Sequence, residues 1–481
     1  MPEERRNKIK NSLKITKAKR KTQDVIIIKL KIDKNKLNNK SIKTLNTMFF
    51  EAKWLYNYIL DREFNNDIFK IDYKTNYVNV YVKDHYEKRK INYLSAQMKQ
   101  DLLKRTKNNI SGLHELKENG FKIGKLKFKK EINSIPLRQF GKGKTYDIIN
   151  NYNYIRIQRI KQPLKVNGFY ETFTDDENIK HKVLKYDFNA LDFGNAMLIN
   201  ENNNYYIHIT AYTKKEETDN NKITGMDLGI KTQITMSNGL KLEYNIPESK
   251  REIRLQRRLS RKAKYVEGSN SKKKLAKEQS KNYCKNKNKL NKEQQKRNNK
   301  KRDVKNKIVH YIASNYKIVI TQNDNISGWQ RLFGKKIENT GIGSIIEALK
   351  NKDKNKVSNL ILVDRFIPTT KECNNCHNKY DIKLDERIYN CPNCGFIIDR
   401  DYNSSLNMIY HGIIKLNELL KIKNKKLNNY FKKYNINLNV PMERRELTPV
   451  EIIASGFEGL NISPYVKLSM VSEAGSLYAL A

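Results

Sequence analysis

The chain has 481 residues and 38% hydrophobic content, enough for a sizeable core and roughly two to four domains. It carries 96 Lys and Arg residues against 51 Asp and Glu residues, so the formal charge is +45 and the surface requires polyanionic partners. The codon bias of an AT-rich genome does not by itself favour Lys over Asp and Glu by so wide a margin, so it leaves part of the excess of basic residues unexplained. Nucleic acid is therefore the expected partner. No apolar run approaches the roughly 18 residues of a transmembrane helix, which excludes a membrane partner and predicts a soluble, intracellular protein.

The first half of the chain alternates between β-rich and helical patterns. Residues 1–20 are basic and are expected to be weakly structured, and residues 22–32 then form a strand with alternating Lys. Helical patterns follow at 41–63 and 94–116. Further strands are expected at 146–160 and 186–213. This order predicts a β-rich module that contains a helical insertion.

The second half has the pattern of a mixed α/β domain. Residues 223–245 contain two or three short antiparallel strands, and a basic, interrupted helical region follows at 247–315. Two apolar strands, 316–324 and 359–366, flank a helix, and a last helix spans 402–423. This order fits an RNase H-like α/β core, whose acids lie on the first strand, at the end of the fourth strand and at the start of the last helix. Such acids hold two divalent ions that activate a water, and their oxygen ligands favour magnesium or manganese.

Four of the cysteines form two Cys-x-x-Cys pairs that can close one tetrahedral site. Each turn presents two sulfurs to the same ion, and the spacing between the pairs leaves room for a short two-stranded knuckle. Two disulfides are the alternative, but they belong to secreted proteins, and no secretion signal is recognisable. His377 is surplus to a four-sulfur zinc site. The predicted ligands are Cys373, Cys376, Cys391 and Cys394.

Two aspartates occupy positions that favour chemistry. Asp227 lies inside an apolar strand, where a carboxylate is costly unless it is paired or binds a metal, so a functional role is favoured. Asp401 begins the last helix, where helix stabilisation and catalysis are equally consistent with its position. Arg400 beside it contacts a phosphate or orients the acids, and the sequence does not decide between these roles.

Four motifs occur in order along the second half of the chain. They are GMDLGIKT at 225–232, DNISGWQRLFGKKI at 324–337, DRFIPTTKECNNC at 364–376 and CPNCGFIIDRDYNSSLN at 391–407. Together they resemble TnpB, the transposon-associated RNA-guided nuclease related to compact type V CRISPR effectors. Further similar segments at 55–57, at 124–169 and from residue 447 onwards extend the resemblance over nearly the whole chain.

The resemblance implies an α/β protein with an RNase H-like (RuvC) nuclease core that carries a zinc-ribbon insertion. It also implies a β-rich wedge domain with a helical recognition insertion. The expected boundaries are 1–40 and 121–215 for the wedge domain, 41–120 for the helical recognition domain, 216–366 and 396–430 for the RuvC-like nuclease domain, 367–395 for the zinc-ribbon segment, and 431–481 for a C-terminal tail.

The resemblance further implies a guide RNA, a double-stranded DNA target beside a short adjacent motif, structural zinc and catalytic magnesium, with manganese as a substitute. The expected location is the prokaryotic cytoplasm, in association with the nucleoid. Pairing with the guide then reads the DNA sequence, while the protein holds the backbone. By matched motif, the first and last metal-binding acids are Asp227 and Asp401.

The middle acid departs from the family pattern. Gln322 stands where the usual glutamate aligns, and an amide is a weaker metal ligand than a carboxylate. Residues two apart in a strand face the same side, so Asp324 is the expected substitute and the third catalytic residue. We expect an active magnesium-dependent endonuclease. The alternatives are a nuclease-inactive, RNA-guided DNA-binding repressor, and a non-guided nuclease or transposase acting on element ends.

Overall fold

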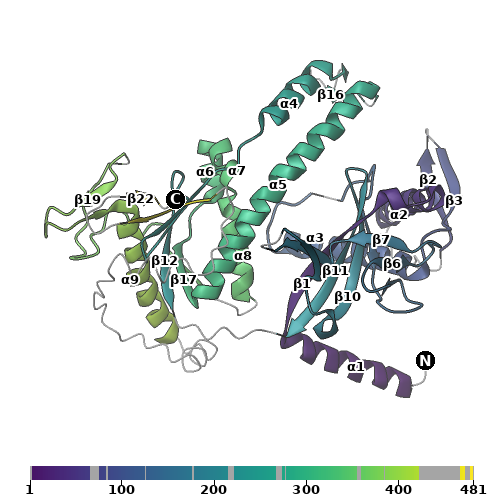
Figure 1. Cartoon of the computed structure of the whole chain (residues 1–481), viewed down its shortest axis with the longest axis horizontal. Helices are drawn as coiled ribbons and strands as arrows, with labels where there is room; N and C mark the ends of the chain where they lie inside the picture. The colour runs from purple at the N-terminus through teal and green to yellow at the C-terminus, as the bar shows by residue number, and fades with distance from the viewer. Residues whose placement is uncertain are drawn as a thin grey trace. The chain divides into compact units, whose positions relative to one another are not determined.

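The computed structural model describes residues 3–64, 75–82, 85–124, 126–175, 178–214, 222–266, 274–276, 278–354, 359–383, 385–421, 466–471 and 477–479. The chain divides into two compact units, Met1–Glu216 and Glu217–Ala481 (Figure 1). Across the described ranges, no helix combines the length and the apolar character needed to cross a membrane.

The first unit is built on a seven-stranded antiparallel sheet with the order β4-β10-β11-β1-β7-β6-β5. In β1, Ile28, Leu30 and Ile32 are buried while the intervening lysines are exposed, as expected for a strand with one face on the core. The strands are β1 (Gln23–Ile32), β4 (Ser134–Leu137), β5 (Tyr146–Ile149), β6 (Tyr154–Ile157), β7 (Leu164–Asn167), β10 (Asp192–Glu201) and β11 (Asn204–Lys214).

Two long helices lie between β1 and β4 in the chain and share one hydrophobic core with the sheet. They are α2 (Asn39–Phe64) and α3 (Ala96–Glu118). The carboxylate of Glu51 on α2 is buried and accepts the backbone N–H groups of Asn92, Tyr93 and Leu94, which fixes the segment that leads into α3. Two hairpins complete the unit: β2 (Tyr77–Val82) with β3 (His85–Lys90), and β8 (Tyr170–Thr174) with β9 (Lys180–Leu184).

The expectation of a weakly structured beginning is wrong, because residues 3–21 form helix α1 (Glu3–Lys21). Straight-chain Lys and Arg residues are good helix formers, and the last turn is anchored on the sheet. Arg20 donates to Asp192 Oδ2 at 3.2 Å, and its guanidinium lies 3.5 Å from the centre of the Tyr212 ring. These contacts come from two distant strands, so the local sequence gives no sign of them.

The second unit contains a seven-stranded mixed sheet with the order β18-β17-β12-β13-β14-β21-β22. β17 pairs in parallel with both β12 and β18, and the other neighbours are antiparallel. The strands are β12 (Ile223–Leu228), β13 (Ile234–Met236), β14 (Leu240–Tyr244), β17 (Ile318–Gln322), β18 (Asn359–Val363), β21 (Val466–Val471) and β22 (Leu477–Ala479).

Helices cover both faces of this sheet (Figure 1). On one face, α5 (Lys281–Asn315), α7 (Lys335–Thr340) and α8 (Ile342–Lys354) share a core with Met226 and Val319. On the other face, α9 (Arg400–Lys421) packs Met408 against Ile318 and Ile320. Successive residues of a strand point to opposite faces, so β12 sends Met226 into the first core and Asp227 towards α9.

The connections between these strands are helical. The expected single helix between β17 and β18 is three helices, because α6 (Ile326–Phe333) precedes α7 and α8. The interrupted basic region consists of α4 (Lys250–Lys262), a short ribbon of β15 (Tyr265–Val266) and β16 (Lys274–Leu275), and α5. Of the expected tail, 431–481, only 466–471 and 477–479 lie within the described residues, where β21 extends the sheet beside β14.

The contact between α9 and the sheet depends on a glycine in β12. A Cβ atom added to Gly225 would lie 1.9 Å from the Ser405 carbonyl oxygen of α9, and neither backbone can move alone. We expect Gly225→Ala to lower the free energy of unfolding by at least about 3 kcal/mol, because overpacking here displaces α9. Urea denaturation measures this change.

Gly112→Ala is the matched control, because an added Cβ on this helical residue of α3 meets nothing within 4 Å. It should stabilise the chain by about 0.5–1 kcal/mol through helix propensity. Equal effects of the two substitutions would show that α9 does not rest against Gly225.

Candidate active site

Asp227 lies on an interior strand of the sheet, β12, between the parallel strand β17 and the antiparallel strand β13. Ser404 Oγ on α9 donates to Asp227 Oδ1 at 2.9 Å. The same hydroxyl lies 3.0 Å from Thr369 Oγ1, so the carboxylate is tied to α9 and to the segment that follows β18. Ser404 therefore holds the Asp227 carboxylate directly and links it to Thr369.

Asp401 lies in the first turn of α9, next to two arginines. Arg400 Nε and Nη2 lie 3.2 and 3.1 Å from Asp401 Oδ1, and Arg387 Nη1 lies 3.4 Å from Oδ2. Arg400 thus contacts the acid directly, which is the arrangement that the orienting role requires.

The helix-capping role belongs to Asp399 rather than to Asp401. Asp399 Oδ1 accepts the backbone N–H of Tyr402 at 2.9 Å, and the nearly buried Lys241 Nζ on β14 donates to Asp399 Oδ2 at 2.7 Å. This ion pair fixes the start of α9 above the sheet, and the capping hydrogen bond needs no contribution from Asp401.

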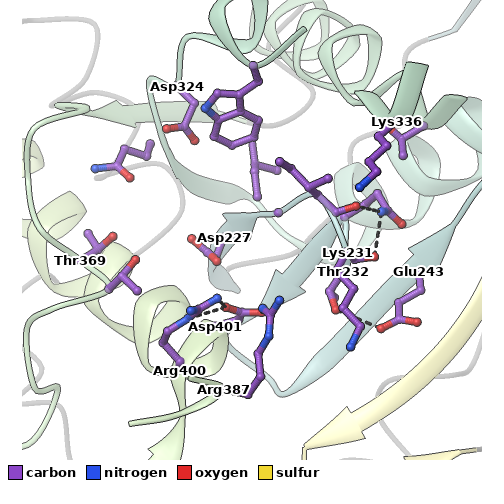
Figure 2. Close-up of a pocket in the computed structure, with 18 of the residues that line it drawn as sticks. Asp227, Lys231, Thr232, Glu243, Asp324, Lys336, Thr369, Arg387, Arg400 and Asp401 are labelled. Carbon is purple, nitrogen blue, oxygen red and sulfur yellow. Dashed lines mark hydrogen bonds and ion pairs between the residues drawn. The ribbon is translucent and has the colours of Figure 1, made fainter. Parts of the chain in front are cut away.

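Asp324 follows β17 by two residues and lines the same pocket as Asp227 and Asp401. Figure 2 shows the three carboxylates around this pocket, which has a volume of about 1240 Å³. Burial raises the pKa of Asp324 to about 6. The three predicted acids are thus brought together from a strand, a loop and a helix.

The electrostatics of the pocket fit a cation. Burial, and then the charges of Asp401 and Asp324, raise the pKa of Asp227 to about 8, against the opposing effects of the Ser404 hydroxyl and Arg400. Repulsion of this kind is relieved when a divalent cation binds between carboxylates.

Cations also line the pocket, which suits a phosphodiester next to the acids. The basic residues of the lining are Lys231, Lys336, Arg365, Lys371, Arg387 and Arg400.

Gln322 has a structural role at the end of β17. Its Nε2 donates to the carbonyl oxygens of Asp364 at 3.1 Å and Ile367 at 2.7 Å. Both acceptors follow β18, so the amide joins the ends of two strands beside the pocket. A glutamate side chain cannot donate these bonds when it is ionised.

The four predicted cysteines converge, and they are the one group of at least three His, Cys, Asp or Glu ligands in the described residues whose atoms all lie within 4.8 Å. The Sγ atoms of Cys373 and Cys394 are 3.7 Å apart, and those of Cys376 and Cys391 are 3.6 Å apart. Disulfides would need about 2.05 Å. Tetrahedral zinc with sulfur ligands at about 2.3 Å requires sulfur separations near 3.8 Å, so the residues fit zinc.

His377 is not part of this cluster, and its ring contacts two other side chains. Its Nδ1 lies 3.0 Å from Glu372 Oε1, and its ring stacks on Tyr410 with centres 4.1 Å apart. The remaining cysteine, Cys284, is exposed on α5 and belongs to no such ligand group within the described chain.

A buried amide clamp, formed by Asn403 and Asn407 of α9, joins the cysteine segment to the acids. Asn403 Nδ2 donates to the Glu372 carbonyl oxygen at 2.7 Å, and its Oδ1 accepts the backbone N–H of Asn374 at 3.0 Å. Asn407 Nδ2 lies 2.8 Å from the Thr369 carbonyl oxygen and 2.7 Å from that of Glu372. Both side chains are fully buried.

Sequence reasoning missed this clamp, together with Ser404, Thr369 and Lys241. The one available signal was the i, i+4 spacing of Asn403 and Asn407, which places two amides on one face of a helix in a motif already singled out.

The raised pKa of Asp227 predicts a pH dependence of stability. Between about pH 4 and pH 8, Asp227 keeps its proton in the folded state and has lost it in the unfolded state. The free energy of unfolding therefore falls as pH rises through this window. In magnesium-free buffer, the free energy of unfolding should fall roughly 1–2 kcal/mol further between pH 6 and pH 8 in the unmodified chain than in Asp227→Asn. Urea denaturation across pH measures the difference.

Magnesium should reverse this loss at pH 8 in the unmodified chain and not in Asp227→Asn. Parallel pH profiles of the two proteins would contradict the raised pKa, and equal stabilisation by magnesium would contradict metal binding at Asp227.

Comparison with known proteins gives one match to a domain family. Residues 343–408, from α8 to the first turns of α9, match the family described as Cas12f1-like, TNB domain. No curated protein matches the chain. Among solved structures, a chain of the cryo-EM structure of the Cas12f1-sgRNA-target DNA complex is similar over 80% of this chain and 99% of that chain, with 13% identity and a TM-score of 0.42. The domain match spans the four cysteines and Asp401.

Proposed function

We propose that this chain is an RNA-guided DNA endonuclease of the TnpB and Cas12f1-like group, encoded by a transposon. The observation that carries the proposal is the convergence of Asp227, Asp324 and Asp401 on one pocket. Magnesium ions, when bound there, supply a metal-activated water and stabilise the leaving oxygen of a phosphodiester.

The strand order supports a RuvC-like nuclease domain. The first strand, β12, lies between the antiparallel pair β13 and β14 and the parallel pair β17 and β18. The acids lie on the first strand, just after the fourth strand and in the first turn of the last helix, which is the arrangement expected of an RNase H-like core.

The residues around the pocket have different roles in this proposal. Ser404 and Arg400 orient Asp227 and Asp401, and the surrounding Lys and Arg side chains attract the phosphate backbone. Asn403 and Asn407 hold the backbone of Glu372 and Thr369 against α9, and zinc held by the four cysteines would fix the segment that follows Glu372. Guide-RNA pairing selects the DNA strand, beside a short adjacent motif.

The test uses the full chain, purified with RNA transcribed from the flanks of its own gene. Incubation with matched DNA and magnesium should give cleavage, and a chelator or a mismatched guide should abolish it. Tight guided binding without a cut product, in magnesium or manganese, would overturn the nuclease and leave the repressor function. Cleavage that ignores the guide would favour a non-guided nuclease or a transposase.

The neutral residue at position 322 gives a sharper prediction. Gln322→Glu should lower the free energy of unfolding by roughly 1–3 kcal/mol, because two donated hydrogen bonds are lost and a carboxylate faces carbonyl oxygens. Cleavage should not rise. Gln330→Glu, at an exposed position of α6, is the matched control for urea denaturation.

Asp324→Ala should remove most of the cleavage, because in this proposal Asp324 supplies the third carboxylate in place of Gln322. Full activity of Asp324→Ala, or a gain of activity in Gln322→Glu, would show that Asp324 is not the substitute acid.

A further inference from the structure

The turn that follows β18 exposes an aromatic side chain next to the acidic pocket. Phe366 is 82% exposed, the largest exposed fraction among the large apolar side chains in the described chain. Arg365 before it and Ile367 after it both line the pocket that contains the three aspartates. The Phe366 ring is therefore open to solvent between two residues of the proposed catalytic site.

Hydrogen bonds fix the backbone of this turn on both sides of Phe366. Gln322 Nε2 donates to the Asp364 carbonyl oxygen at 3.1 Å and to the Ile367 carbonyl oxygen at 2.7 Å. The backbone N–H of Phe366 donates to Asp364 Oδ1 at 2.8 Å, and that of Ile367 donates to the Asp364 carbonyl oxygen at 3.3 Å. The position at which the ring leaves the backbone is thus set by the end of β17, beside Asp324.

An aromatic residue at this place contributes little to the fold. Tight turns favour Gly, Pro, Asn, Asp and Ser, and an apolar side chain stabilises a protein through the area that it removes from water. Single exposed apolar side chains are ordinary on protein surfaces, so exposure alone supports no conclusion. Phe366 differs because its backbone is fixed and its neighbours line a pocket with three acids. This combination indicates that a ligand of the pocket covers the ring.

The chemistry of the turn matches an unpaired nucleotide. The Arg365 guanidinium carbon lies 5.2 Å from the centre of the Phe366 ring, so a cation and an aromatic face are presented together. A nucleotide offers the two complementary parts, a phosphate and a base with a π face, and in a single strand that face is free to stack on an aromatic side chain. We propose that Phe366 stacks on a base of the DNA strand that enters the pocket, while Arg365 contacts the adjoining phosphate. The stacked base then places the scissile phosphate over the three carboxylates.

This inference rests on the proposed guided nuclease and adds a residue that positions its substrate. The test uses the full chain with its guide RNA and matched DNA in which the strand to be cut carries a single abasic site, moved stepwise through the nucleotides on either side of the cut bond. Single-turnover cleavage is measured for the unmodified chain and for Phe366→Ala, Phe366→Leu and Phe366→Trp. The matched control is Phe50→Ala, because Phe50 on α2 is 55% exposed, has Lys53 Nζ 5.3 Å from its ring centre and does not line the pocket.

Phe366→Ala should slow cleavage of the intact strand about tenfold, because base–aromatic stacking is lost. At one position the abasic site should slow the unmodified chain and Phe50→Ala to a similar extent, but should slow Phe366→Ala by less than about twofold further, since the two changes remove the same contact. Phe366→Leu should behave like Phe366→Ala because it has no π face, whereas Phe366→Trp should cleave at nearly the normal rate. A purely structural role of Phe366 would leave the abasic effect equal in the unmodified chain and in Phe366→Ala. That result, or a normal cleavage rate of Phe366→Ala, would overturn the proposal.

Photocrosslinking keeps this outcome separate from that of the proposed nuclease. The guided complex is assembled in calcium on DNA that carries 5-iodouracil at each of the tested positions, and the crosslinked peptide is identified by mass spectrometry. If only the nuclease proposal fails, no strand is cut in magnesium, but a crosslink still forms at Phe366 and is lost in Phe366→Leu. If only the stacking proposal fails, guided cleavage occurs, and Phe366→Ala cleaves and crosslinks like Phe50→Ala.

Discussion

Asp227→Asn is expected to reduce guided DNA cleavage about 10³-fold, while binding of RNA and matched DNA changes by less than about twofold. The asparagine keeps the shape of the side chain and can still accept the Ser404 hydrogen bond. It removes the charge that a divalent cation needs, and metal stabilisation of a transition state contributes several kcal/mol, at about 1.4 kcal/mol per tenfold in rate.

Single-turnover cleavage and filter binding on the same preparation separate these effects. Asp303→Asn, on the exposed surface of α5, is the matched control and should leave both unchanged. Because Asp227 repels its acidic neighbours, the substituted protein should also be more stable than the unmodified chain in magnesium-free buffer at pH 8. Retained cleavage would remove Asp227 from the catalytic site.

Cys391→Ser is expected to have the second-largest effect, on both stability and cleavage. The Cys391 side chain is buried, and zinc bound by four thiolates contributes about 10–16 kcal/mol to the folding of small zinc domains. Loss of one ligand should release zinc, lower the melting temperature and loosen the segment whose Glu372 and Thr369 carbonyl oxygens accept hydrogen bonds from α9. Metal analysis, thermal melting and cleavage measure the three consequences.

The control is Cys284→Ser, which removes a thiol from an exposed position and should leave zinc content unchanged. A further variant separates zinc binding from its effect on the acids. Asn407→Asp keeps the side-chain shape but loses the two donated hydrogen bonds, so it should retain zinc and still cleave more slowly. Full cleavage by a zinc-free Cys391→Ser protein would contradict the coupling through α9.

Local patterns predicted most of the element order. Strand 22–32 is β1 (Gln23–Ile32), and helix 41–63 is α2 (Asn39–Phe64), because alternation and helical periodicity reflect burial directly. The pattern failed at residues 1–20, where the contacts of Arg20 with Asp192 and Tyr212 join a helix to two strands far along the chain. Long-range contacts of this kind leave no local signal.

Some residues of the candidate site could be predicted from the sequence and others could not, for a similar reason. The acids and cysteines are recognisable because few other residue types serve their chemistry, and the structure brings each set together. Ser404 and Asn403 are common helix residues whose roles depend on what packs against α9, so the sequence could not single them out. Gln322 was considered only as a missing ligand, and its bonds to the end of β18 became evident only in three dimensions.

Strand β21 determines how this protein responds to truncation before residue 466. It pairs along the whole of β14, from Leu240 to Tyr244, and β22 in turn covers β21. If the chain were cut before β21, β14 would present a row of unpaired N–H and C=O groups to solvent. Such exposed edges recruit strands from other molecules, so truncation should promote aggregation.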